Sequence, residues 1–207
     1  MKNKPTITTL FLDVGGVLLS NGWGHEFRQQ AAENFHLNIQ KIEERHAIMF
    51  ATYEEGNVNL KEYLRSIVFY QNRDFTMDEF RDFMFSLSTP FIDMIAFIEI
   101  LKIKYSLKIV AVSNEARELN AYRIQKFQLS SVVDLFISSC YVHLRKPDAN
   151  IFRMALDVAH VSAGQVIYID DVQLFVDVAT GLGIRGIHHK DYLSTVKELA
   201  AIGLSVE

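Results

Sequence analysis

Acidic, hydroxyl and amide side chains follow three apolar runs of the sequence. Asp13 follows the first run, Ser113 and Asn114 follow the second, and Asp170 and Asp171 follow the third. For any one such residue, a turn or a helix cap is the commoner explanation. Two adjacent carboxylates at the end of an apolar run repel each other unless a cation or a basic group compensates, and a hard divalent metal ion is the simplest compensation. Together these residues therefore indicate a site that binds a metal ion.

Lys146 adds a positive charge to this set. It stands next to Pro147, just before a predicted helix. Considered alone, it is explained equally well as a surface lysine. In the company of the acids and of Ser113, it is interpreted as the counter-charge of a bound phosphate group.

The elements that must position these residues alternate between strand and helix from about residue 90 onward. The three apolar runs predict buried strands, and two shorter runs predict further strands. The strands are expected at Thr8–Leu12, Leu107–Val112, Val166–Ile169, 135–138 and 185–187. Helices are expected between the later strands, at 115–127, 148–159 and 173–182. This alternation predicts a parallel α/β sheet, in which the carboxyl ends of the strands face one crevice and bring distant residues together.

The segment from Gly22 to Leu87 interrupts the alternation, because it has helical periodicity and no convincing strand. It is predicted to be an inserted helical module. After it, Thr89 and Pro90 are typical of an N-cap followed by proline at the first helical position, so a helix is expected to begin there.

Composition excludes several classes of function. The hydrophobic fraction of 49% and the charged fraction of 22% are typical of a globular chain rather than a disordered one. A net charge of -4 gives no attraction to nucleic acid or to an anionic membrane. No segment is predicted to be a signal peptide or a membrane span, and the single cysteine, Cys140, excludes an intrachain disulfide. A cytoplasmic location is therefore expected.

Four strings in order, FLDVGGVLL, VAVSN, RKPDANIF and VIYIDD, resemble the four motifs of the haloacid dehalogenase-like hydrolase superfamily. The inserted helices resemble that superfamily's all-helical C1-type cap. The first motif is similar to the DxGGV or DxGNV motif of sugar-phosphate phosphatases. The resemblance implies an α/β, Rossmann-like, doubly wound parallel sheet as the core, with an all-helical cap domain inserted in it. The core is expected to comprise residues 1–20 and 88–207, and the cap residues 21–87.

The resemblance also implies roles for individual residues. Asp13 is expected to be the nucleophile that forms an aspartyl-phosphate, and Lys146 is expected to orient the phosphate and neutralise its charge. Ser113 and Asn114 are expected to hold the phosphoryl oxygens. The implied cofactor is Mg²⁺, and its expected ligands are Asp13, the backbone carbonyl of Gly15, Asp170 and Asp171.

One position departs from the family pattern. Most phosphatases of the superfamily place a second aspartate two residues after the nucleophile, as an acid and base, whereas this chain has Gly15 there. Acid–base help of this kind is typically worth about 10²- to 10⁴-fold in rate. We hypothesise that a group of the cap, a group of a loop or water replaces the missing acid, and His25 is a candidate for this role. Trp23 is a candidate for a residue that lines the substrate site. For both residues, packing is the competing interpretation.

The sequence thus predicts a Mg²⁺-dependent phosphatase acting on a small phosphorylated metabolite, with a sugar phosphate the best guess. The alternative is a phosphate-ester-binding or regulatory protein with weak turnover because of Gly15. Dehalogenation uses the same nucleophile without a metal ion, and the acid pair at Asp170 and Asp171 disfavours it. Mutase activity is disfavoured because it generally needs the missing acid.

Overall fold

The computed structural model describes residues 6–206, so residues 1–5 of the predicted core domain and Glu207 lie outside the described part. Helices and strands alternate along it. Their bounds are β1 Thr9–Leu12, α1 His25–Asn34, α2 Ile39–Glu54, α3 Leu60–Ile67, α4 Met77–Ser86, α5 Ile92–Tyr105, β2 Lys108–Ser113, α6 Arg117–Lys126, η1 Leu129–Ser131, β3 Leu135–Ser138, α7 Ser139–Val142, α8 Ala149–Ala159, η2 Ala163–Gln165, β4 Val166–Asp170, α9 Gln173–Gly181, β5 Arg185–His188 and α10 Tyr192–Ala200.

The core is a five-stranded sheet in the order β3-β2-β1-β4-β5, and all neighbouring strands are parallel. The prediction of a doubly wound α/β sheet is therefore confirmed. β1 lies in the centre, where Leu12 is opposite Ala111 of β2 and Ile169 of β4. The carboxyl ends of these three strands consequently lie next to one another.

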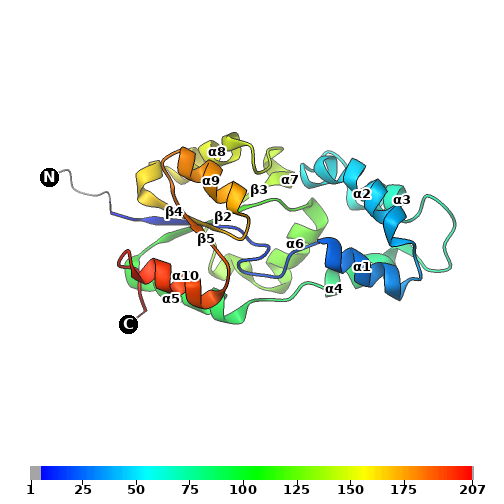
Figure 1. Cartoon of the computed structure of the whole chain (residues 1–207), viewed down its shortest axis with the longest axis horizontal. Helices are drawn as coiled ribbons and strands as arrows, with labels where there is room; N and C mark the ends of the chain where they lie inside the picture. The colour runs from blue at the N-terminus through cyan, green and yellow to red at the C-terminus, as the bar shows by residue number, and fades with distance from the viewer. Residues whose placement is uncertain (1–5, 207) are drawn as a thin grey trace.

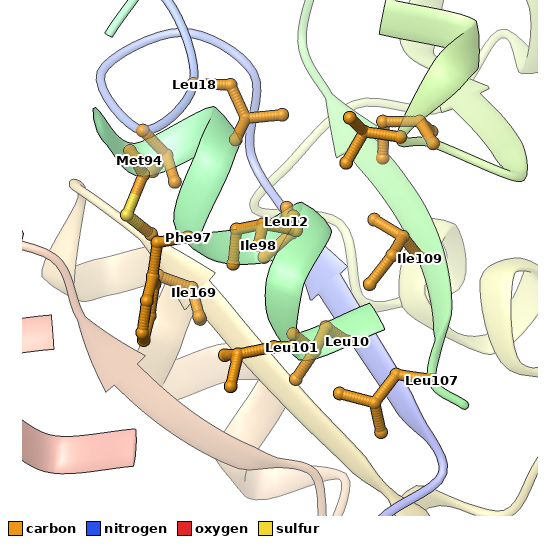
Figure 2. Packing of buried hydrophobic residues seen from close by; sticks show 14 of the residues in the cluster. Leu10, Leu12, Leu18, Met94, Phe97, Ile98, Leu101, Leu107, Ile109 and Ile169 are labelled. Carbon is orange, nitrogen blue, oxygen red and sulfur yellow. The ribbon is translucent and has the colours of Figure 1, made fainter. Parts of the chain in front are cut away.

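Helices cover both faces of the sheet, with α5 and α10 on one side and α8 and α9 on the other (Figure 1). Successive strand residues point to opposite faces. Leu10 and Leu12 therefore join the cluster that contains Phe97 of α5, as Figure 2 shows. Phe11 joins the opposite cluster with Phe152 of α8. Because both faces are buried, the central residues of β1, β2 and β4 are apolar, as expected for a parallel sheet.

Helices α1 to α4 lie together beyond one end of the sheet (Figure 1). They share an apolar cluster of their own, with Tyr63, Leu64 and Phe80 fully buried. Two of these helices begin at capping boxes, at Asn59 for α3 and Thr76 for α4, which fixes where each starts. The exact division into a core and a cap at residues 21 and 87 stays a prediction.

The predicted helix start at Thr89 and Pro90 is wrong. Helix α5 begins at Ile92, after Phe91 as the N-cap. The carbonyl of Thr89 accepts a hydrogen bond from Ser20 N at 2.8 Å, and Pro90 forms a bridge with Leu19. The chain enters and leaves the helical segment through these two stretches, and the pairing of their backbones replaces the expected cap. Proline tolerates this position because a strand edge does not require its missing N–H.

Within residues 6–206, we find no helix that is both long and apolar enough to span a membrane.

Candidate active site

Asp13, Lys146 and Asp170 meet at the carboxyl ends of β1 and β4. The Lys146 ammonium lies 3.0 Å from Asp13 Oδ2 and 2.7 Å from Asp170 Oδ2. Lys146 and Asp170 are fully buried, and Asp13 is 8% exposed. Three residues that the sequence places far apart thus form one buried cluster of two carboxylates and an amine.

Asn114 holds Lys146 in place. The Asn114 side chain accepts a hydrogen bond from Lys146 N at 2.8 Å and donates one to Lys146 O at 2.9 Å. Both the oxygen and the nitrogen of the side-chain amide are therefore hydrogen-bonded to the main chain of the loop that precedes α8. Asn114 thus positions the main chain of Lys146, whereas its contact with a phosphoryl oxygen stays a prediction.

Asp170 is fixed from both of its oxygens. Oδ2 accepts hydrogen bonds from Lys146 and from the Tyr168 hydroxyl, and Oδ1 accepts one from Val172 N at 2.7 Å. These contacts satisfy a carboxylate that has no access to water, as burial of a charge requires. The carboxylate is therefore held in a single orientation.

The carboxylates of Asp13, Asp170 and Asp171 form a group that can hold a metal ion, with one oxygen from each lying within 4.8 Å of the others. The pKa of Asp13 is raised to about 7, chiefly by burial, while Lys146 lowers it and Asp170 and Asp171 raise it. Burial and Asp170 likewise raise the pKa of Asp171. One lysine thus does not balance three acids. A hard divalent cation with oxygen ligands, such as Mg²⁺, fits this donor set.

The second glycine of the first motif makes room for this cluster. Gly16 has a φ of +75°, and a Cβ added there would lie 2.2 Å from Asp171 Oδ2. A side chain at this position would displace the Asp171 carboxylate. Gly16 therefore allows the loop after β1 to pass directly beside the acid that follows β4.

Ser113 ends β2 beside this cluster, and its side chain is 1% exposed. Its hydroxyl has no hydrogen-bond partner among the described residues. Leaving a buried hydroxyl unpaired costs about 1–3 kcal/mol. An unpaired hydroxyl at this edge of the sheet fits the predicted contact with a ligand oxygen, although Ser113 is not itself among the walls of the cavity described next.

A cavity of about 390 Å³ separates the ends of the strands from the helical segment. Its walls on the strand side include Asp13, Gly15, Asn114, Glu115 and Asp171, together with Phe175 of α9 and Arg145. Its walls on the other side come from the helical segment and include Trp23, Arg28, His46, Phe50, Tyr53 and Glu54. The predicted nucleophile Asp13 and two of the other predicted metal ligands, Gly15 and Asp171, therefore line a space that the inserted helices close.

Of the two cap residues predicted to contact substrate, Trp23 and His25, the structure places only Trp23 in this cavity. The Trp23 indole donates a hydrogen bond to Tyr63 Oη at 3.0 Å, so it serves the packing of the segment as well. His25 lies elsewhere, with a side chain that is 67% exposed and a Nδ1 3.0 Å from Glu43 Oε1. The prediction that His25 contacts substrate is therefore corrected, because helix α1 begins there and pairs it with α2.

The histidine that does line the cavity is His46, which was not among the residues predicted to contact substrate. Its Nδ1 lies 2.6 Å from Tyr63 Oη, and burial lowers its pKa to about 4, so the imidazole is neutral near pH 7. His46, Phe50 and Tyr53 are spaced along one face of α2. That spacing was the available signal, but an apolar helix face more often packs in a core.

Two of the cavity walls are arginines, and each is paired with a carboxylate. Arg28 donates to both oxygens of Glu43, at 2.8 and 2.9 Å, and Arg145 donates to Glu54 at 2.8 Å. Neither pair was expected from the sequence, because the partners come from different helices or from a helix and a distant loop. Each arginine therefore has a carboxylate of the protein as its partner.

Gly15, where the family's second aspartate is missing, is closely surrounded. A Cβ added there would lie 3.1 Å from Asn21 Oδ1 and 4.0 Å from Glu115 Oε1. The space next to it is thus taken by a side-chain amide and by a buried carboxylate whose pKa is raised by burial and lowered by Arg123.

We expect Gly15→Asp to lower the free energy of unfolding by roughly 1–2 kcal/mol, because it adds a second carboxylate beside Glu115. Gly15→Ala is the matched control. It requires only a small shift of the Asn21 side chain, so its effect should be smaller. Urea denaturation of the two variants measures the difference, and equal stability of the two would show that Glu115 does not oppose a charge at this position.

Comparison with known proteins places the chain in a family. The family model for haloacid dehalogenase-like hydrolases matches residues 16–188, so the chain belongs to that family. It is 25% identical over 167 residues to flavin mononucleotide hydrolase 1 of Arabidopsis thaliana, a match that covers 81% of this chain and 67% of that protein. A shorter match, 30% identical over 69 residues, covers 33% of this chain and 12% of bifunctional epoxide hydrolase 2 of Sus scrofa.

A solved structure shares the fold. A family enzyme from Bacteroides thetaiotaomicron, in complex with magnesium and inorganic phosphate, superposes with a TM-score of 0.71 at 21% identity. The match covers 89% of this chain and 94% of that one. This likeness establishes the architecture.

Proposed function

We propose that this hydrolase is a Mg²⁺-dependent phosphatase that attacks a phosphate monoester with the carboxylate of Asp13. The observation that carries the proposal is the position of Lys146, whose buried ammonium contacts both Asp13 and Asp170. An amine so placed can neutralise a bound phosphate next to the attacking oxygen. The magnesium and phosphate bound by the Bacteroides thetaiotaomicron enzyme support this proposal.

Electrostatics explain why the amine is needed. A carboxylate and one phosphate charge about 4 Å apart repel by roughly 4 kcal/mol at an effective dielectric constant near 20. Lys146 offsets part of this repulsion. When bound, Mg²⁺ supplies further positive charge next to the carboxylates of Asp13, Asp170 and Asp171 and polarises the phosphoryl oxygens.

The reaction divides into two displacements. Asp13 attacks the phosphorus atom and the leaving oxygen departs, which leaves a phosphoryl group on Asp13. Water then attacks the same phosphorus atom and frees Asp13. Ser113 and Lys146 hold the phosphoryl oxygens during both steps, and Asn114 keeps Lys146 in position.

The cavity favours a small metabolite with a neutral leaving group, such as a sugar phosphate. Both arginines in its wall already donate to carboxylates of the protein, Glu43 and Glu54, which disfavours a second anionic group on the ligand. Tyr53 lines the cavity, and its buried hydroxyl has no partner among the described residues, which suits a hydroxylated ligand. The flavin mononucleotide hydrolase relative, by its name, also acts on a phosphate ester.

Gly15 favours a second candidate, a phosphate-ester-binding or regulatory protein that turns over slowly. The absent aspartate would cost about 10²- to 10⁴-fold in rate if no other group transfers the proton. The two candidates differ in turnover rather than in binding.

The test is a panel of phosphate esters, including sugar phosphates and flavin mononucleotide, assayed for phosphate release with Mg²⁺ and with EDTA. We expect release that depends on Mg²⁺, at about 1 per second or faster on an alkyl ester. Tight binding with slower turnover would support the regulatory protein instead. Halide release from a 2-haloacid in EDTA, without phosphate release from any ester, would contradict both candidates and indicate a dehalogenase.

A further inference from the structure

One carboxylate of the cavity wall comes from the helical segment. Glu54 is the last residue of α2 and its side chain is 20% exposed. Both Arg145 nitrogens that contact it bind the same oxygen, Oε2, at 2.8 and 3.2 Å. Among the described residues, Oε1 has no hydrogen-bond partner, so one carboxyl oxygen of Glu54 remains available to a ligand in the space that Asp13 also lines.

The end of α2 that carries Glu54 is tied to the sheet domain. Ser139 Oγ donates a hydrogen bond to Glu54 O at 2.6 Å, and His143 Nδ1 lies 2.7 Å from Glu55 O. Gly56, with a φ of +72°, lies so close to α7 that an added Cβ would be 2.3 Å from Cys140 O. These contacts hold Glu54 at a fixed place relative to the strand ends, as proton transfer requires.

The other proton-bearing groups of the cavity are poor substitutes for the missing aspartate. Glu115 is almost fully buried and paired with Arg123. Burial raises the pKa of Tyr53 well above 10, so its hydroxyl keeps its proton. His46 has a pKa of about 4 and carries no acidic proton to donate at neutral pH.

The surroundings of Glu54 suit a group that both gives and takes a proton. The pKa of Glu54 is raised to about 7, chiefly by burial, while Arg145 and Lys146 lower it and Glu115 raises it. A carboxyl group that titrates near the working pH is populated in both forms, which is the condition for acid–base catalysis.

We propose that Glu54 takes the place of the aspartate that Gly15 lacks, as the acid and base of the two displacements. This inference rests on the proposed phosphatase function. In the first step the P–O bond to the leaving group breaks, and the Glu54 carboxyl transfers its proton to that oxygen to release an alcohol. In the second step the Glu54 carboxylate takes a proton from the attacking water, the bond between phosphorus and Asp13 breaks, and inorganic phosphate leaves.

The test compares Glu54→Gln with Glu55→Gln on two esters, p-nitrophenyl phosphate and an alkyl phosphate. A nitrophenolate is a good leaving group without being protonated. An alkoxide is a poor one, so its oxygen has to receive a proton as it leaves. We expect Glu54→Gln to slow the alkyl ester about 10²- to 10³-fold and p-nitrophenyl phosphate less than about fivefold, as loss of a general acid predicts. Glu55→Gln makes the same chemical change one residue further on, outside the cavity, and should leave both rates unchanged.

The pH profile provides a second readout. Because the first step needs protonated Glu54, kcat/KM for the alkyl ester should fall as the pH rises through about 7, and Glu54→Gln should remove that fall. Equal losses on the two esters, or an alkyl-ester rate within threefold of the parent, would overturn the assignment of Glu54. If the parent protein releases phosphate from neither ester, the phosphatase proposal fails instead. Retained aryl-ester turnover also shows that the variant is folded.

Discussion

Asp13→Asn should lower the rate of phosphate release roughly 10⁴-fold or more, because the amide is not a nucleophile toward phosphorus and no second group replaces it. The substitution keeps the shape of the side chain. Asn Oδ1 can still accept the hydrogen bond from Val14 N, which is 2.7 Å in the parent. The protein should therefore fold normally, and steady-state assays with Mg²⁺ measure the loss directly.

Asp177→Asn is the matched control. Asp177 is an exposed acid on α9 whose carboxylate accepts a hydrogen bond from Gln173 at 2.7 Å, and it does not line the cavity. The same chemical change there should leave the rate within about twofold of the parent, as expected for a surface substitution. An Asp13→Asn protein that kept more than about a hundredth of the parent rate would show that another residue attacks the phosphorus atom.

Lys146→Met should harm both stability and turnover. It removes a buried amine that contacts Asp13 and Asp170 and leaves two carboxylates without their counter-charge. Breaking a buried ion pair by removing one partner typically costs about 3–5 kcal/mol. In the folded fraction, phosphate release should fall by about 10²- to 10³-fold, which is the usual effect of removing one group that stabilises transition-state charge.

Urea denaturation at pH 7 and assays on the folded fraction separate the two effects of Lys146→Met. Lys126→Met provides the control, because Lys126 is an exposed residue in the last turn of α6. A Lys146→Met protein within about 1 kcal/mol of the parent would show that the two carboxylates are not charged together in the folded protein.

The sheet and its crevice were predictable from the sequence. Buried parallel strands are short apolar runs, and all five predicted runs are strands whose ends differ from the prediction by one residue at most. The parallel order then forces Asp13 and Asp170 to the same edge. Lys146 lies in the loop between α7 and α8, so its place beside these acids was expected from the family resemblance and not from the topology of the sheet.

The helical segment was less predictable, because the directions of its side chains depend on how its helices pack. Proximity to the first motif favoured His25, but α1 directs that residue toward Glu43 and α2 brings His46 to the cavity instead. Glu54 was missed for the same reason. An acid at the end of a helix has no distinguishing pattern until its pairing with Arg145 and its anchoring to α7 are known.

Local contacts also decided where the helices begin. Helix α10 was not expected from the sequence, although Asp191 and Ser194 form a capping box at its start. At the start of α5, by contrast, the sequence suggested a cap at Thr89 that does not form. The backbone of Thr89 pairs instead with the segment that leads from β1 into the helical segment. Such competition is set by tertiary structure and leaves no mark in the local sequence.

The most direct test of the account is to trap the phosphorylated carboxylate. The protein would be mixed with Mg²⁺ and a phosphate ester, quenched with acid during turnover and reduced with borohydride, which converts an aspartyl-phosphate into homoserine. We predict that mass spectrometry of the digested protein will find this conversion at Asp13 and that the Asp13→Asn protein will show none. Conversion at a different residue would contradict the account, as would turnover that proceeds with no conversion at Asp13 even when breakdown of the intermediate limits the rate.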